Sequence, residues 1–143
     1  MKRDIKEEIE KLLENQGYYP LTTMLWNSFK FTQVRPNSDQ EKQMNLKIIE
    51  SNVKDRKGIY VYKNAAAVIL YVGKGNPLKT RLKSHYSKLS KGNSIRRRDA
   101  FFQDNQGTLT IFWLEIEEKE ERELVEHLLS YLLKPKYKKW RAI

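Results

Sequence analysis

The 143-residue sequence predicts a mixed α/β (α+β) fold in which a three-stranded antiparallel sheet is flanked by helices, with an added helical segment at the N-terminus. Two patterns carry this prediction. Short runs of β-branched and aromatic residues indicate strands in the second half of the chain, and segments with apolar residues every three or four positions indicate helices. The length suits one domain of ordinary size.

The first 57 residues are predicted to form an N-terminal helical extension whose role stays open. A first helix is expected over residues 4–15, because apolar residues recur there at helical spacing: Ile5, Ile9, Leu12 and Leu13. Residues 18–36 are rich in aromatic side chains and read as irregular, with a helix around residues 22–29.

A second helix of this extension is predicted to begin at Ser38. Ser38 and Glu41 have the spacing of a capping box, in which the serine side chain accepts a hydrogen bond from the first turn of the helix. Met44, Ile48 and Ile49 follow as its apolar residues.

A β-hairpin is predicted directly after the extension. Residues 59–62 and 68–72 are β-branched or aromatic, and the short connection between them favours an antiparallel pair. A helix follows from Pro77 to about Leu89, because proline suits a first helical turn. Its inward-facing residues are expected to be Leu78, Leu82 and Leu89.

The last third of the chain is predicted to contain one strand and one helix. Residues 90–99 read as a polar loop, and a third strand is expected over residues 108–115. The final helix spans about residues 119–133 and ends before Pro135. Its buried face is expected to consist of Leu124, Val125, Leu128, Leu129, Leu132 and Leu133.

The composition excludes several classes of site. The chain has no cysteine and only two histidines, so a disulfide framework, a thiolate metal site, a cysteine nucleophile and a multi-histidine zinc site are all excluded. The longest apolar run, residues 65–72, is far shorter than the roughly 18 residues of a membrane span. With no apolar signal sequence at its start, the chain is expected to be a cytoplasmic protein without a membrane segment.

The charge is concentrated in two basic segments. The formal net charge is +10, and residues 74–98 hold nine basic side chains and no acidic one. The tail over residues 134–141 adds five more basic side chains. Segments of this kind attract polyanions such as nucleic acid, although a lysine-rich surface kept for solubility is the plain alternative.

Five residues stand out as candidates for chemistry, and each has an ordinary structural explanation when taken alone. Tyr60 and Tyr71 lie in the two strands of the hairpin, where tyrosine is common. Arg81 and His85 share one helical face, as a solvated surface pair would. Glu126 lies among leucines of the final helix, where it could be a carboxylate paired with a neighbouring cation.

Together these residues resemble the signature of the GIY-YIG nuclease family. Residues 58–60 read Gly-Ile-Tyr and, after ten intervening residues, residues 71–73 read Tyr-Val-Gly. Arg81 and His85 match the arginine and the frequent histidine on the family's next helix. Glu126, nine residues before a proline, matches the family's metal-binding glutamate. The resemblance implies that residues 58–143 form the nuclease domain.

The resemblance implies a divalent-metal-dependent endonuclease that hydrolyses phosphodiester bonds in DNA. One Mg²⁺ or Mn²⁺ ion would be held by Glu126, and Arg81 would hold the charge that develops on the phosphate. Tyr60 is the expected base or water-orienting group, with His85 relaying the proton or contacting the phosphate, and which of the two is the base stays open. Tyr71 would orient water or phosphate.

One position departs from the family pattern. An asparagine usually follows the glutamate by about twelve residues, and Lys138 stands there in this chain. A lysine could contact phosphate directly, but the alternative is a catalytically weak or inactive domain that only binds nucleic acid.

The expected partner is DNA, with RNA not excluded. The residues expected to contact nucleic acid are Lys74, Lys79, Lys83, Lys88, Arg96, Arg97, Arg98 and Lys138. The extension could set target specificity, form a homodimer interface or complete the core.

Overall fold

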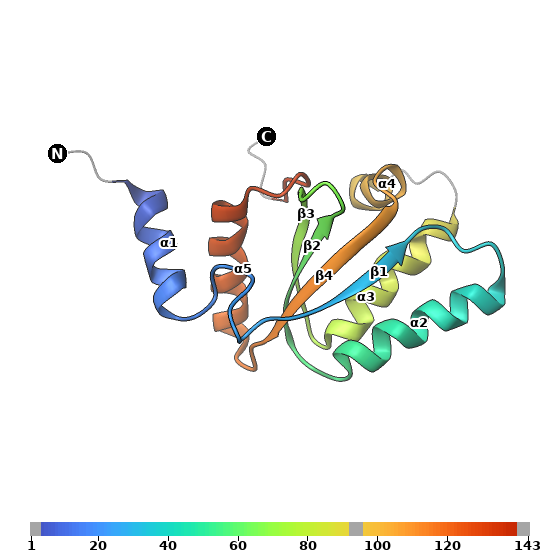
Figure 1. The fold of residues 1–143 in the computed structure, drawn as a ribbon, viewed down its shortest axis with the longest axis horizontal. Coiled ribbons are helices and arrows are strands. Elements are labelled where there is room, and N and C mark those ends of the chain that lie inside the picture. Colours follow the sequence, from blue (N-terminus) through green and yellow to red (C-terminus); the bar gives the residue numbers. More distant parts are fainter. Residues whose placement is uncertain (1–3, 92–95, 140–143) are drawn as a thin grey trace.

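Four strands form one antiparallel sheet in the order β1–β4–β2–β3, so β1 and β3 are its edges (Figure 1). The computed structural model describes residues 4–91 and 96–139. Its strands are β1 (Asn27–Gln33), β2 (Gly58–Asn64), β3 (Ile69–Gly75) and β4 (Gly107–Glu115). The predicted mixed α/β class, with an antiparallel sheet flanked by helices, is confirmed. The predicted count of three strands is wrong, because β1 adds a fourth.

The additional strand lies where the sequence predicted irregular structure and a helix around residues 22–29. Along β1 the side chains alternate between outward and inward positions, with Phe29 and Phe31 turned toward the core. The whole of β1 pairs with β4. A strand of this length depends on the partner that it meets, which local sequence patterns do not reveal.

Helices cover both faces of the sheet (Figure 1). On one face lie α2 (Asp39–Val53), α3 (Leu78–Ser87) and α4 (Arg97–Asp104). On the other lies α5 (Lys119–Leu133), against which α1 (Ile5–Asn15) packs. Among the described residues, no helix combines the length and the apolar character that crossing a membrane requires.

The α4 helix was not predicted. The sequence indicated a polar loop over residues 90–99, but a 3₁₀ helix covers Lys88–Lys91 and α4 begins soon after it. Phe102 holds α4 against the sheet, with its ring 5.0 Å from that of Tyr71. A short basic helix anchored by so few apolar side chains has no helical stripe that periodicity could detect.

The other elements follow the predicted order, with one correction on α5. The capping box is present, since Ser38 Oγ accepts a hydrogen bond of 3.1 Å from the Glu41 N–H. Leu124 was predicted to be buried, but it is 57% exposed. Arg122 and Glu126 lie on the buried face of α5 instead. Polar groups therefore occupy part of the face that hydrophobicity alone assigns to leucines.

The C-terminal tail, residues 134–139, runs along the β3 edge of the sheet. The N–H groups of Lys136 and Tyr137 donate hydrogen bonds of 2.9 and 3.0 Å to the carbonyl groups of Ile69 and Leu70. These bonds hold the tail beside β3, so Lys138 and Lys139 lie next to β3 and α5.

Candidate active site

A cleft of about 600 Å³ opens at the β3 edge, where α3 and α5 contact β3 from the two faces of the sheet. Its lining consists of Lys74, Gly75, Asn76, Arg81, Lys119, Arg122, Glu123, Glu126 and Lys139. Five of these side chains are cationic and two are anionic. The cleft therefore favours an anionic ligand such as a phosphate group.

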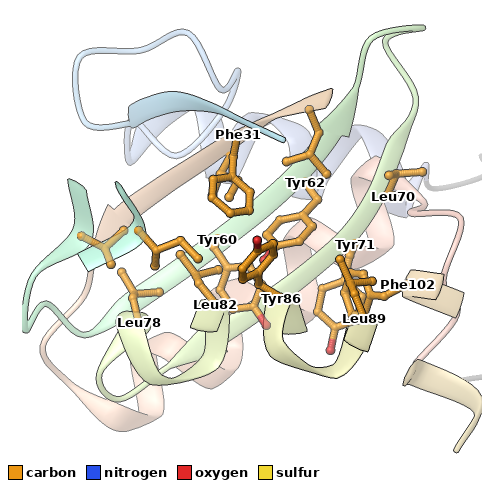
Figure 2. Close-up of a cluster of buried hydrophobic side chains, with 14 of the residues drawn as sticks. Phe31, Tyr60, Tyr62, Leu70, Tyr71, Leu78, Leu82, Tyr86, Leu89 and Phe102 are labelled. Atoms are coloured by element: carbon orange, nitrogen blue, oxygen red, sulfur yellow. The ribbon is translucent and has the colours of Figure 1, made fainter. Parts of the chain in front are cut away.

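Beside the cleft, two of the predicted site residues form a buried pair. The Tyr60 hydroxyl lies 2.6 Å from Nε2 of His85. Tyr60 is fully buried and His85 is only 1% exposed, so His85 is not part of a solvated surface pair. Figure 2 shows Tyr60, Tyr62 and Tyr71 projecting from β2 and β3 into the cluster that includes Leu78 and Leu82 of α3.

The protonation states of this pair follow from its burial. Burial raises the pKa of Tyr60 well above its ordinary value, while Arg81 opposes this shift. Burial also lowers the pKa of His85 well below its ordinary value, and nearby cations such as Arg81 and Lys139 act in the same direction. These directions favour a protonated phenol beside a neutral imidazole, a pair in which the phenol can donate to Nε2.

The lowered pKa of His85 predicts a loss of stability in mild acid. The unfolded chain takes up a proton below about pH 6.5, while the folded chain keeps His85 neutral, so the free energy of unfolding falls as the pH falls. One such group lowers it by about 1.4 kcal/mol per pH unit at most. Urea unfolding at pH 7.5 and 5.5 should show this loss, and His85→Gln should lose less. Equal pH dependence in both proteins would contradict the buried neutral imidazole.

Two glycines of the hairpin permit close approaches that a side chain would prevent. A Cβ atom on Gly58 would lie 1.9 Å from the carbonyl oxygen of Leu114 on β4. A Cβ atom on Gly73 would lie 2.4 Å from the hydroxyl oxygen of Tyr60. The first glycine lets β2 and β4 pair closely, and the second leaves room for the Tyr60 phenol.

Arg81 connects the buried pair with the cleft. It is half-buried on α3 and lines the cleft. Burial acts to lower the pKa of Arg81, but the phenol groups of Tyr60 and Tyr71 outweigh it and raise that pKa overall. The guanidinium group thus stays cationic close to both tyrosines, where it can bind an anion held in the cleft.

Glu126 lies on the opposite wall of the cleft and is almost completely buried. Its Oε2 atom accepts a hydrogen bond of 2.8 Å from Nζ of Lys139. The same ammonium group lies 4.5 Å from the centre of the Tyr71 ring. The sequence reading did not single out Lys139 for the site, because its place there depends on how the tail pairs with β3.

Lys138, the residue at the asparagine position, lies outside this cleft. Its side chain is exposed and lines a neighbouring pocket of about 740 Å³ together with Tyr131 and Lys134. Its carbonyl oxygen accepts a hydrogen bond of 3.0 Å from Nη2 of Arg97. The lysine that reaches the glutamate is therefore the next residue along the chain.

The other predicted nucleic-acid contacts divide into three groups. Lys74 lines the cleft, 3.7 Å from the Glu123 carboxylate. Lys79 and Lys83 form ion pairs of 2.7 and 2.6 Å with Asp55 and Glu50. The remaining predicted contacts, on the 3₁₀ helix and at the start of α4, are Lys88, Arg96, Arg97 and Arg98. Residues 92–95 of this basic segment and 140–143 of the tail, including Arg141, lie outside the described residues.

The donor groups of the cleft fit one largely hydrated divalent ion. Within residues 4–91 and 96–139, no three His, Asp or Glu side chains are grouped as metal ligands. Glu126 offers one buried carboxylate that already contacts a cationic group. Mg²⁺ is commonly held by one or two carboxylates, with water and substrate phosphate as its other ligands.

Comparisons with known proteins identify the family. The profile of the UvrC-like GIY-YIG domain matches residues 56–138. UvrABC system protein C of Bacteroides fragilis is 33% identical over 101 residues, and that of Bacteroides thetaiotaomicron is 30% identical over 103 residues. Each match covers 71% of this chain but only 16% of the relative's length. The chain therefore belongs to the family of UvrC-like GIY-YIG domains, within the GIY-YIG nucleases.

Proposed function

We propose that this protein is a divalent-metal-dependent endonuclease that hydrolyses phosphodiester bonds in DNA. The observation that supports this most directly is the buried Tyr60–His85 hydrogen bond beside a cationic cleft. That cleft also contains Arg81 and the Glu126 carboxylate. Hydrolysis of a phosphodiester needs an activated water, relief of charge on the phosphate and a stabilised leaving oxygen, and these four residues are suited to the three tasks.

Tyr60 and His85 are proposed to activate the water as a relay. The Tyr60 hydroxyl lies 2.6 Å from Nε2 of His85, so the phenol oxygen can accept a proton from water as its own proton moves to the imidazole. Burial, and after it the surrounding cations, lower the pKa of His85 before substrate binds. A phosphate in the cleft adds negative charge near these cations, which raises the affinity of His85 for the proton when it is needed.

Arg81 and Lys74 are proposed to bind the scissile phosphate. The guanidinium fork of Arg81 matches two phosphate oxygens, so it can stabilise the negative charge that increases in the transition state. Lys74 adds a point charge on the same cleft. Tyr71, whose ring lies beneath the Lys139 ammonium, is proposed to orient water or phosphate.

Glu126 is the residue proposed to hold one Mg²⁺ or Mn²⁺ ion. When bound, such an ion acts as a Lewis acid that stabilises the leaving oxygen. Glu126 would hold the ion in a defined position, because its side chain lies on the buried face of α5.

The basic residues around the cleft are proposed to hold the DNA backbone, and RNA is not excluded. Contacts from the 3₁₀ helix, the start of α4 and the tail would position the duplex without reading its sequence. Lys79 and Lys83 are expected to contribute least, because their ammonium groups lie closest to carboxylates, at 2.7 and 2.6 Å, against 3.7 Å for Lys74 and 3.8 Å for Lys88.

The N-terminal extension is proposed to complete the domain. β1 lies within it and pairs along β4, so the extension and the nuclease domain share one sheet. A role in target choice or in a homodimer would use the outer surfaces of α1 and α2.

Cleavage of supercoiled plasmid tests the proposed function. The purified chain should nick or linearise the plasmid with Mg²⁺ or Mn²⁺ and should not do so with EDTA. Branched DNA, single-stranded DNA and RNA oligonucleotides in parallel reactions define the substrate. DNA binding without cleavage of any of these substrates would instead favour a domain that only binds nucleic acid.

Tyr60→Phe is expected to slow cleavage about a hundredfold, the lower end of what a general base contributes, because His85 remains as a proton acceptor. The matched control is Tyr62→Phe, since Tyr62 lies on the same strand, is equally buried, and its hydroxyl has no hydrogen-bond partner in the described part of the chain. Single-turnover rates should fall in the first variant and stay within about twofold in the second. Equal rates in the two variants would remove Tyr60 from the mechanism.

A further inference from the structure

The carboxylate assigned to the metal ion already contacts a cation of the chain itself. Nζ of Lys139 lies 2.8 Å from Oε2 of Glu126, and the two side chains are 21% and 4% exposed. A contact this short to a nearly buried carboxylate is a charge-assisted hydrogen bond, stronger than an ordinary surface ion pair. The Glu126 carboxylate therefore already has a cationic partner within the chain.

The fold of the tail sets the position of Lys139. Two backbone hydrogen bonds hold the tail on β3. The Tyr137 ring packs 5.3 Å from that of Tyr71, and the Arg97 guanidinium lies 4.5 Å from the centre of the Tyr137 ring. Arg97 also donates to the carbonyl group of Lys138. These contacts fix the backbone on both sides of Tyr137, and the Lys139 side chain then reaches the cleft.

Glu126 cannot bind Lys139 and a divalent ion equally well. Two cations at one carboxylate repel each other, most strongly where water is scarce. A nearly buried carboxylate without any cation is also costly, because its charge has lost hydration without compensation. An arrangement in which one cation replaces the other avoids both penalties.

We propose that Lys139 is an exchangeable counterion of Glu126. It neutralises the carboxylate until a divalent cation binds. Its ammonium group then leaves the carboxylate and stays within the cleft, where it is available to the substrate phosphate. This inference rests on the proposed function in one respect, the assignment of the metal ion to Glu126. It adds a residue that the family signature in this sequence does not contain.

The exchange makes metal binding and the ion pair mutually exclusive, which has two measurable consequences. Removing the ammonium group should tighten metal binding, because no internal cation has to be displaced. It should also lower the stability of the metal-free protein, which a bound metal ion then restores.

The test measures Mn²⁺ binding to the full chain by electron paramagnetic resonance of the free ion. The variants are Lys139→Met, Lys139→Gln and, as a matched control, Lys138→Met, which removes the same charge from the neighbouring exposed position. The Kd for Mn²⁺ is expected to fall about tenfold in both Lys139 variants, since the competing ion pair is gone, and to stay within about twofold in the control. Circular dichroism checks that each variant is folded.

Thermal unfolding provides the second measurement. In EDTA the Lys139→Met protein should melt below the wild type, and Mn²⁺ should raise its Tm by more than it raises that of the wild type. Unchanged or weaker Mn²⁺ binding by this variant overturns the proposal, as does equal tightening in Lys138→Met, which would reflect net charge alone.

The two proposals fail in different ways. Mn²⁺ binding that is present in the wild type and lost in Glu126→Gln, but unaffected by the Lys139 variants, overturns the exchange and leaves the metal site standing. An absence of Mn²⁺ binding in every variant overturns the metal site and the exchange together.

Discussion

Glu126→Gln is expected to lower the cleavage rate by about a thousandfold or more, which corresponds to the several kcal/mol that a bound metal ion contributes to the transition state. Glutamine has nearly the same shape but no negative charge, so it cannot hold a divalent ion as the carboxylate does. Binding of DNA to the cleft should survive, because the cationic residues that line it are unchanged. Single-turnover cleavage in Mg²⁺ and a binding titration in EDTA measure the two properties separately.

The matched control for this change is Glu123→Gln. Glu123 lies one helical turn before Glu126, lines the same cleft, and has a side chain that is 45% exposed beside Lys74. Its substitution makes the same change in charge and should alter the rate by less than about fivefold, because an exposed ion pair contributes little. Full activity of the Glu126→Gln protein in Mg²⁺ would refute the metal assignment.

Arg81→Ala is expected to have an effect of similar size on the rate, about a thousandfold, with a smaller effect on DNA affinity. The guanidinium group is the half-buried cation next to both the phenols and the cleft, so its removal leaves the charge of the transition state without a fixed donor. Arg81→Lys should recover only part of the rate, because an ammonium group lacks the planar fork. Single-turnover rates at saturating enzyme separate this effect from binding.

Lys83→Ala is the comparison for Arg81. It removes a cation from the same helix, but that cation is paired with Glu50 at 2.6 Å. Its rate should stay within about threefold of the wild type, as expected for a side chain in an exposed ion pair. Similar losses in the two variants would mean that α3 contributes general positive charge and that Arg81 has no specific role.

The fold could be predicted where elements carry their own signals. The capping box of Ser38, the β-branched hairpin and the leucine-rich final helix all have patterns that act over a few residues, and each is present in the structure. β1 and α4 lacked such patterns. β1 depends on its pairing with β4, and α4 depends on the packing of Phe102 against the sheet, so both elements are determined by tertiary structure.

The candidate site shows the same division. The spacing of residues along the sequence pointed to Tyr60, Arg81 and Glu126. Their functional roles stay predictions, while the structure gives the contacts that surround them. The burial of His85 and the charge on Lys139 beside Glu126 were not foreseen. Both result from contacts between different segments of the chain, and the spacing of residues within a single segment does not predict such contacts.

The tail that brings Lys139 to the site also protects the sheet from self-association. An exposed edge strand offers unpaired N–H and carbonyl groups on which another chain can add a strand, and natural proteins cover or charge such edges. Here the tail occupies the carbonyl groups of Ile69 and Leu70 on β3, while β1 carries the exposed Lys30 at the middle of the opposite edge. Shortening the tail should therefore expose a template for aggregation as well as disturb the site.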